Sequence, residues 1–135
     1  MSANVTDRLE ITELFARLAY LLDEKRWADA GTVYADDVVA RSPRGAEIHG
    51  LDQLIDFLCK AEVEGVHTQH RHTDVLVEVT GEQATVSAYE LVHFYREGEP
   101  PHQTSGLRLN HTAVRTPAGW RFRGARITLA WTRKD

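Results

Sequence analysis

The stretch that decides the fold is "HTQHRHTDVLVEVTGEQATV", which covers residues 67–86. From Val75 to Val79 every second residue is valine, which is the period of a β-strand with one buried face. Residues 80–83, "TGEQ", are typical of a hairpin turn, and the apolar residues within 84–95 predict the returning strand. The stretch therefore predicts a long antiparallel hairpin.

Two further strands are predicted beyond this hairpin. Residues 96–101, "REGEPP", form a polar break whose two prolines do not fit the interior of a sheet. Residues 104–115 and 120–132 then alternate in polarity on either side of a turn at 116–119. The second half of the chain is therefore predicted to be antiparallel sheet.

The first half of the chain has helical patterns. Residues 6–22 place apolar side chains at intervals of three and four, which predicts an amphipathic helix. A shorter helix is predicted at 27–34, a short strand at 38–41, and a third helix from Leu51 onward. Three helices followed by hairpins indicate an α+β domain, in which the helices cover one face of a curled, mostly antiparallel sheet and enclose a pocket with it.

Length and composition narrow the class of protein. The 135 residues suit a single domain spanning 1–135, and 42% hydrophobic with 27% charged residues is ordinary globular composition. A net charge of -4 argues against nucleic acid as a partner. There is no run of ~18 apolar residues and no export leader, so we expect a cytoplasmic protein without a membrane partner. The single Cys59 excludes an internal disulfide, and its helical setting predicts a small core residue.

A histidine cluster is the main chemical feature. His67, His70 and His72 open the first long strand, and His93 lies on the returning strand. Imidazole can both take and give a proton near neutral pH, so the cluster indicates either a proton-transfer site or a row of half-exposed strand histidines. A metal site is not expected, because His67 lies on the opposite strand face from His70 and His72, and no HExxH motif is present.

Four segments together resemble a known family. They are "LLDEKRWADAGTVYADDVV" (21–39), "IHGLDQLIDFL" (48–58), "HTQHRHTDVLVEVTGEQATV" (67–86) and "GLRLNHTAVRTPAGWRF" (106–122). In order and spacing they resemble SnoaL-like proteins of the nuclear-transport-factor-2-like superfamily. The resemblance implies a cone-shaped α+β barrel whose helices close a pocket. The superfamily hosts dehydratases, isomerases, polyketide cyclases, dehydrohalogenases and binding modules, so the site must decide the function.

The resemblance also implies a catalytic pair. In the branch of scytalone dehydratase, bile-acid dehydratase and the dehydrochlorinases, an Asp at the end of the first helix holds a His that removes a proton from carbon. Asp23 and His70 fall on these two positions. The physical logic is that a carboxylate bound to one ring nitrogen fixes the tautomer and stabilises the imidazolium formed at the other. A solvated carboxylate at the helix end is the alternative for Asp23.

The chain also departs from relatives. Ketosteroid isomerases need a Tyr donor and an Asp base where this chain has Leu18 and Ser42, and the helper lysine of the dehydrochlorinase also corresponds to Leu18. Another residue must then assist the leaving group. The candidates for substrate binding are Tyr20, His111, Leu18 and Arg126, the last of which falls where some relatives place a C-terminal Arg. The alternative for Tyr20 is a packing side chain with a solvated hydroxyl, and the alternative for Arg126 is an exposed strand residue.

These observations predict a cofactor-independent lyase or isomerase of the dehydratase or cyclase type. Its substrate would be a small, largely apolar hydroxylated or carbonyl compound, with His70 as the base. The alternative is a non-catalytic ligand-binding or assembly module of the same fold, such as a dioxygenase small subunit. A homodimer is expected, with Val92, Phe94 and Trp131 as candidate interface residues. The register of the returning strand decides whether Tyr89, His93 and Tyr95 line the pocket or the outer face.

Overall fold

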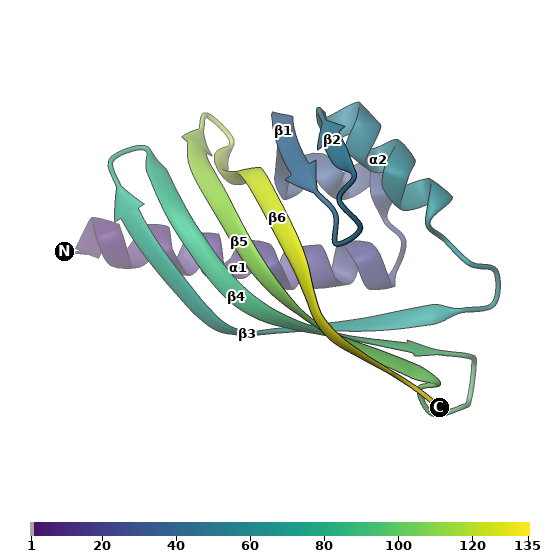
Figure 1. Ribbon diagram of the computed structural model, residues 1–135. Coiled ribbons are helices and arrows are strands. Elements are labelled where there is room, and N and C mark those ends of the chain that lie inside the picture. Colours follow the sequence, from purple (N-terminus) through teal and green to yellow (C-terminus); the bar gives the residue numbers. More distant parts are fainter. Residues whose placement is uncertain (1) are drawn as a thin grey trace.

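The computed structural model describes residues 2–135. Two α-helices and one 3₁₀-helix accompany six strands (Figure 1). In chain order the elements are α1 (Ser2–Asp23), η1 (Trp27–Thr32), β1 (Tyr34–Arg41), β2 (Glu47–His49), α2 (Leu51–Lys60), β3 (His67–Thr80), β4 (Gln83–Tyr95), β5 (Gln103–Thr116) and β6 (Gly119–Lys134).

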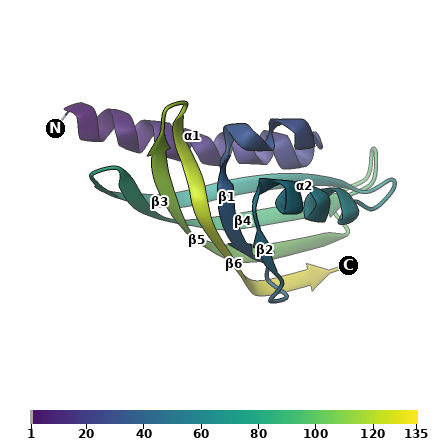
Figure 2. The same ribbon diagram turned by 90° about the horizontal axis from the view of Figure 1, so that it is seen from above.

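The six strands form one curved sheet in the order β2-β1-β6-β5-β4-β3. All neighbours are antiparallel except β1 and β6, which run parallel. Figure 1 shows β3 to β6 as long bent strands with α1 crossing behind them, and Figure 2 shows α1 running alongside the sheet. The predicted α+β class with a curled, mostly antiparallel sheet is therefore confirmed.

The core lies between α1 and the inner face of the sheet. Successive turns of α1 bury Ile11, Leu14, Phe15, Leu18 and Leu21, as the spacing of three and four requires. Inner-face side chains of the sheet meet them, among them Val86, Ala88, Leu109, Trp120 and Phe122. This burial fixes which strand residues point toward the helix.

A β-bulge in β3 sets the register of the first long hairpin. The pairing shifts between Thr73 and Leu76, and Asp74 at this point has a φ of 55°. An extra residue in one strand reverses which side chains point inward beyond it. As a result, His70 and His72, which precede the bulge, point to the inner face together with Val75, which follows it. In a regular strand His72 and Val75 would point to opposite faces, because they are three residues apart.

Several predicted details were wrong. The second of the three predicted helices is a single 3₁₀ segment, because Tyr34 already belongs to β1 rather than to a helix. The short strand β2 was not predicted. Cys59 is exposed and not a core residue, because α2 turns Leu54 inward and leaves Cys59 on its other side. Leu9, on the predicted apolar stripe of the first helix, is also exposed.

No helix of residues 2–135 combines the length and the hydrophobicity that a bilayer crossing requires.

Candidate active site

Asp23 and His70 form a partly buried, hydrogen-bonded side-chain pair. Nδ1 of His70 lies 2.6 Å from Oδ1 of Asp23. The backbone N–H of His70 donates to Oδ2 of the same carboxylate at 2.9 Å, and the Thr68 hydroxyl donates to Oδ1 at 3.0 Å. Three donors on one carboxylate hold it rigidly. The hydrogen bond between Asp23 and His70 that was expected is therefore present.

The end of α1 explains how Asp23 reaches β3. Asp23 is the last helical residue, and Lys25 then adopts a φ of 56°, which turns the chain away. The backbone N–H of Arg26 donates to the carbonyl of Leu21 at 2.9 Å and closes the helix end. Lys25 also lies 3.9 Å from Glu62, which ties this turn to the loop after α2. The carboxylate of Asp23 is thus left facing the inner side of β3.

A second imidazole–carboxylate pair lies next to the first. Nε2 of His72 is 2.9 Å from Oε1 of Glu90, which stands directly opposite on β4. The exposed fractions of the two side chains are 4% and 8%, against 13% and 21% for His70 and Asp23. Glu90 was not predicted as a site residue. The sequence signal that could have found it is its place in the alternation of β4, among Ala88 and Val92.

His111 lies deeper still, on β5. Its ring packs 4.8 Å from that of Phe122 and 6.0 Å from that of Phe15. It is 3% exposed, and burial lowers its pKa to about 4 because no solvent stabilises the imidazolium. Its Nδ1 is buried without a hydrogen-bond partner among the described residues. A polar atom buried among aromatic rings without a hydrogen-bond partner destabilises the folded state, unless another molecule binds to it.

Tyr34 completes this buried polar group. It is buried at the start of β1, where burial and the nearby Glu90 raise the pKa of its phenol. The sequence pattern placed Tyr34 on the face of a helix, and Tyr34 was not predicted as a site residue. Its hydroxyl therefore stays protonated at neutral pH and remains a donor.

Of the remaining predicted site residues, one is buried and two are exposed. Leu18 is buried on the core face of α1, as a wall residue would be. Tyr20 is 63% exposed, because it lies on the other side of α1 from Leu18 and Leu21. Arg126 is exposed on the outer face of the sheet, where it lies opposite Asn110 in the register of β5 and β6. The residues on either side of it in the chain, Ala125 and Ile127, point inward.

Tyr89, His93 and Tyr95 lie on the outer face. Nδ1 of His93 is 2.9 Å from the hydroxyl of Thr104, and the Tyr95 ring lies 5.4 Å from that of His67. Tyr89 carries the guanidinium of Arg108 over its ring. Val92, a predicted interface residue, is instead buried on the inner face opposite His70.

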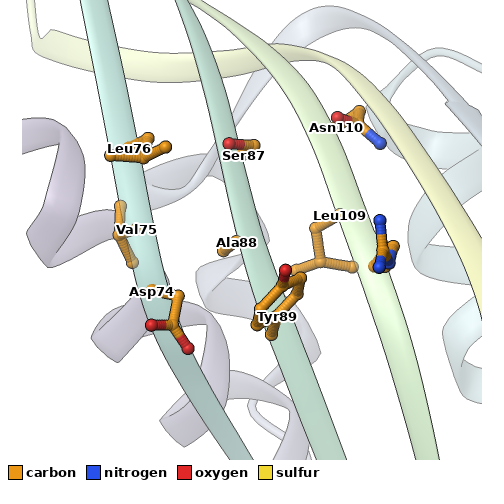
Figure 3. A pocket seen from close by; sticks show the side chains of 9 residues that line it. Asp74, Val75, Leu76, Ser87, Ala88, Tyr89, Leu109 and Asn110 are labelled. Carbon is orange, nitrogen blue, oxygen red and sulfur yellow. The ribbon is translucent and has the colours of Figure 1, made fainter.

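A hollow of about 450 Å³ lies on the outer face of the sheet, where Figure 3 shows Leu76, Ser87, Tyr89 and Asn110 on neighbouring strands. A second hollow of about the same volume is lined by residues of the same three strands, His111 among them. The buried imidazoles of the inner face belong to the packed space between α1 and the sheet. Within residues 2–135 no three His, Cys, Asp or Glu side chains converge as metal ligands would.

Comparison with known proteins extends the picture. No curated protein sequence matches the chain. Among solved structures, the Kfla4162 protein from Kribbella flavida superposes with a TM-score of 0.87 at 24% identity, covering 96% of this chain and 95% of that one. A candidate scytalone dehydratase from Novosphingobium aromaticivorans gives 0.85 at 16% identity, with coverages of 100% and 92%. A type 2 hexachlorocyclohexane dehydrochlorinase, LinA, gives 0.83 at 13%, with coverages of 98% and 90%.

At these identities the structures show a shared fold and no more. The match to a family is direct: the SnoaL-like domain covers residues 3–126, nearly the whole chain. The curved sheet, the crossing helix α1 and the family match agree, and the chain belongs to the SnoaL-like domain family.

Proposed function

We propose that the chain is a cofactor-independent lyase or isomerase that begins its reaction by moving a proton from carbon to His70. The observation that carries this proposal is the Asp23 carboxylate, which accepts from the ring, the backbone and the Thr68 hydroxyl at once. A side chain fixed by three donors is already oriented for its role before substrate arrives.

The chemistry follows from the tautomer. Asp23 accepts from Nδ1–H of His70, which leaves Nε2 of that ring with a free lone pair. Nε2 takes a proton from a carbon next to a carbonyl, and the carboxylate stabilises the resulting imidazolium. The enolate oxygen needs a donor, which the protonated hydroxyl of Tyr34 supplies in this proposal.

The substrate class follows from the surroundings of the pair. Apolar side chains, among them Phe15, Leu18 and Val92, share the interior with His70. They favour a small, largely apolar compound, while the orphaned Nδ1 of His111 favours one that also carries a hydroxyl or carbonyl group. A hydroxylated ketone of modest size meets both demands.

The direct test is proton exchange without any leaving group. The probe is 2-tetralone in deuterated buffer, and the loss of its α-proton signals is followed by NMR. We expect the protein to speed this exchange, and His70→Ala to lower the enhancement by about 100-fold or more, which is the usual contribution of a general base. Asp23→Asn should lower it too, because it reverses the tautomer preference.

The matched control is His93→Ala, since His93 is another strand histidine but bonds Thr104 on the outer face. It should exchange 2-tetralone like the wild type. Exchange that is equal in His70→Ala and in the wild type would show that His70 is not the base, and the proposed function would then be wrong.

A binding or assembly module is the second candidate, and the outer face favours it. The exposed side chains of Leu76 and Tyr89 line the hollow of about 450 Å³ there. A second copy of the chain on this face would cover these residues and the exposed Trp131, so we propose a cytoplasmic homodimer. Analytical ultracentrifugation of the wild type and Leu76→Glu tests this: the variant should be monomeric, and a monomeric wild type contradicts it.

A further inference from the structure

Two imidazole–carboxylate pairs stand side by side on one strand face. The rings of His70 and His72 have centroids 6.4 Å apart and planes only 23° from parallel. In each ring one nitrogen is hydrogen-bonded to a carboxylate, which leaves Nε2 of His70 and Nδ1 of His72 available to other partners. Such a repeat places two proton-carrying rings within reach of one small molecule.

The second pair has no evident structural purpose. Burying an imidazole and a carboxylate together costs desolvation free energy, and apolar side chains of similar volume usually hold a core at least as well. His72 contacts the ring of Phe15 at 5.3 Å, in a position where an aromatic or aliphatic residue would pack. A group kept there at such a cost calls for a role in chemistry.

The order of burial indicates how a substrate would meet these groups. The exposed fraction falls from 21% at Asp23 through 13% at His70 to 4% at His72. A substrate bound at His70 would then have the more deeply buried His72 at its inner end. His72 is therefore placed to act on an atom one or two bonds beyond the carbon that His70 deprotonates.

We propose that His72, paired with Glu90, is the acid that protonates the leaving oxygen while His70 acts as the base. This inference rests on the proposed function and adds to it the acid that dehydration of a β-hydroxy carbonyl compound requires. Neither His72 nor Glu90 was among the site residues predicted from the sequence.

The proton and electron count of the step is complete. Nε2 of His70 takes the proton from the α-carbon, and the C–H electron pair becomes the new C=C bond. The C–O bond breaks with its electron pair on oxygen, and that oxygen takes the proton of His72 and leaves as water. His72 regains a proton and His70 loses one to solvent, so no oxidant or cofactor is required.

The geometry suits such a step. In such a step the base nitrogen lies about 3 Å from the α-carbon, and the acid nitrogen lies about 3 Å from the oxygen on the next carbon. The two nitrogens can then be about 6 Å apart. The centroid separation of 6.4 Å is compatible with that span. The titratable groups around His72 are Glu90 on β4, His70 on β3, His111 on β5 and, farther off, Tyr34 on β1 and Asp23 on α1.

The first test counts ring protons and needs no substrate. Long-range ¹H–¹⁵N correlation spectra at pH 7 distinguish an imidazolium from a neutral ring. We expect His72 to carry protons on both nitrogens, and the Glu90→Gln variant to lose one of them, because only a carboxylate supports the charged ring. A wild-type His72 ring with a single proton overturns the inference.

The second test separates the acid from the base. The probes are 4-hydroxy-4-phenylbutan-2-one and its acetate ester, which both eliminate to the same enone and are followed by its absorbance. Acetate leaves as a stable anion, whereas hydroxide needs a proton. His72→Asn should slow the hydroxy probe by about 100-fold or more and the acetate by less than about 3-fold, as for loss of a general acid.

The remaining variants make each outcome decisive. His93→Asn is the matched control and should convert both probes like the wild type. Equal losses on both probes in His72→Asn overturn the acid role. His70→Asn should slow both probes alike; if it slows neither, the proposed function fails, whatever His72→Asn does. If the wild type converts neither probe, the proton count on His72 decides alone.

Discussion

At the scale of single residues, Gly106 shows how closely the outer face is packed. A Cβ on Gly106 would overlap the indole ring of Trp131, which lies directly opposite on β6. We expect Gly106→Ala to displace that ring and lower the free energy of unfolding by about 1 kcal/mol, the lower end for overpacking, because Trp131 is half exposed and can swing away. Urea denaturation monitored by circular dichroism measures this.

Gly31→Ala is the matched control, since a Cβ there meets a Leu51 methyl at 3.6 Å, an ordinary contact distance. It should cost less than Gly106→Ala. In the double variant with Trp131→Ala the clash is gone, so the two changes should be non-additive. Simple additivity would show that Gly106 and Trp131 do not interfere.

At the scale of elements, the start of α1 is fastened to the β5–β6 hairpin. Both carboxylate oxygens of Asp7 accept from Arg115, at 2.9 and 2.8 Å, and the indole N–H of Trp120 donates to Oδ1 at 3.1 Å. The bonds from Arg115 and then Trp120 hold the pKa of Asp7 below its ordinary 3.8. Because the folded pKa is lowered, the stabilisation is complete above pH 3.8 and is lost as the pH falls through the folded value.

We therefore expect Asp7→Asn to lower the melting temperature at pH 7 and to have little effect near pH 2. Differential scanning calorimetry at the two pH values measures the difference. Glu13→Gln is the control, since its bond to Arg17 joins two exposed residues of the same helix and should contribute little. A difference that persists undiminished at pH 2 would contradict the assignment to this ion pair.

At the scale of the whole molecule, the buried His111 makes stability depend on pH. Its pKa is lowered to about 4 in the folded chain from an ordinary 6.5. Between these values the unfolded chain binds the proton and the folded chain does not. Stability from this group is therefore complete above pH 6.5 and declines as the pH falls toward 4, by roughly 2–3 kcal/mol at pH 4.5.

His111→Leu removes this dependence. The free energy of unfolding of the variant, minus that of the wild type, should therefore be roughly 2–3 kcal/mol higher at pH 4.5 than at pH 7. Urea titrations at the two pH values give the difference, in which the carboxylates common to both proteins cancel. His102→Leu, an exposed histidine, is the control and should show no such rise. Parallel curves for His111→Leu and the wild type would mean that His111 is not held neutral by burial.

The amino-acid sequence by itself predicted most of the elements and the contact between Asp23 and His70. Periods of 3.6 and 2 identified α1, α2 and the four long strands, because each of these elements buries one face. Asp23 and His70 could be paired because the resemblance to a family matched both the helix end and the strand. These are properties of local pattern and spacing, which need no knowledge of the packed core.

Only the tertiary structure decided which residues face each other across the first hairpin. Thr80 lies opposite Gln83, and if the pairing continued without a shift, His72 would lie opposite Leu91. The bulge at Asp74 moves the pairing by one residue and sets His72 opposite Glu90 instead. The bulge is stable because it lets the residues on both of its sides bury their inner face against α1, a cooperative gain that no local pattern contains.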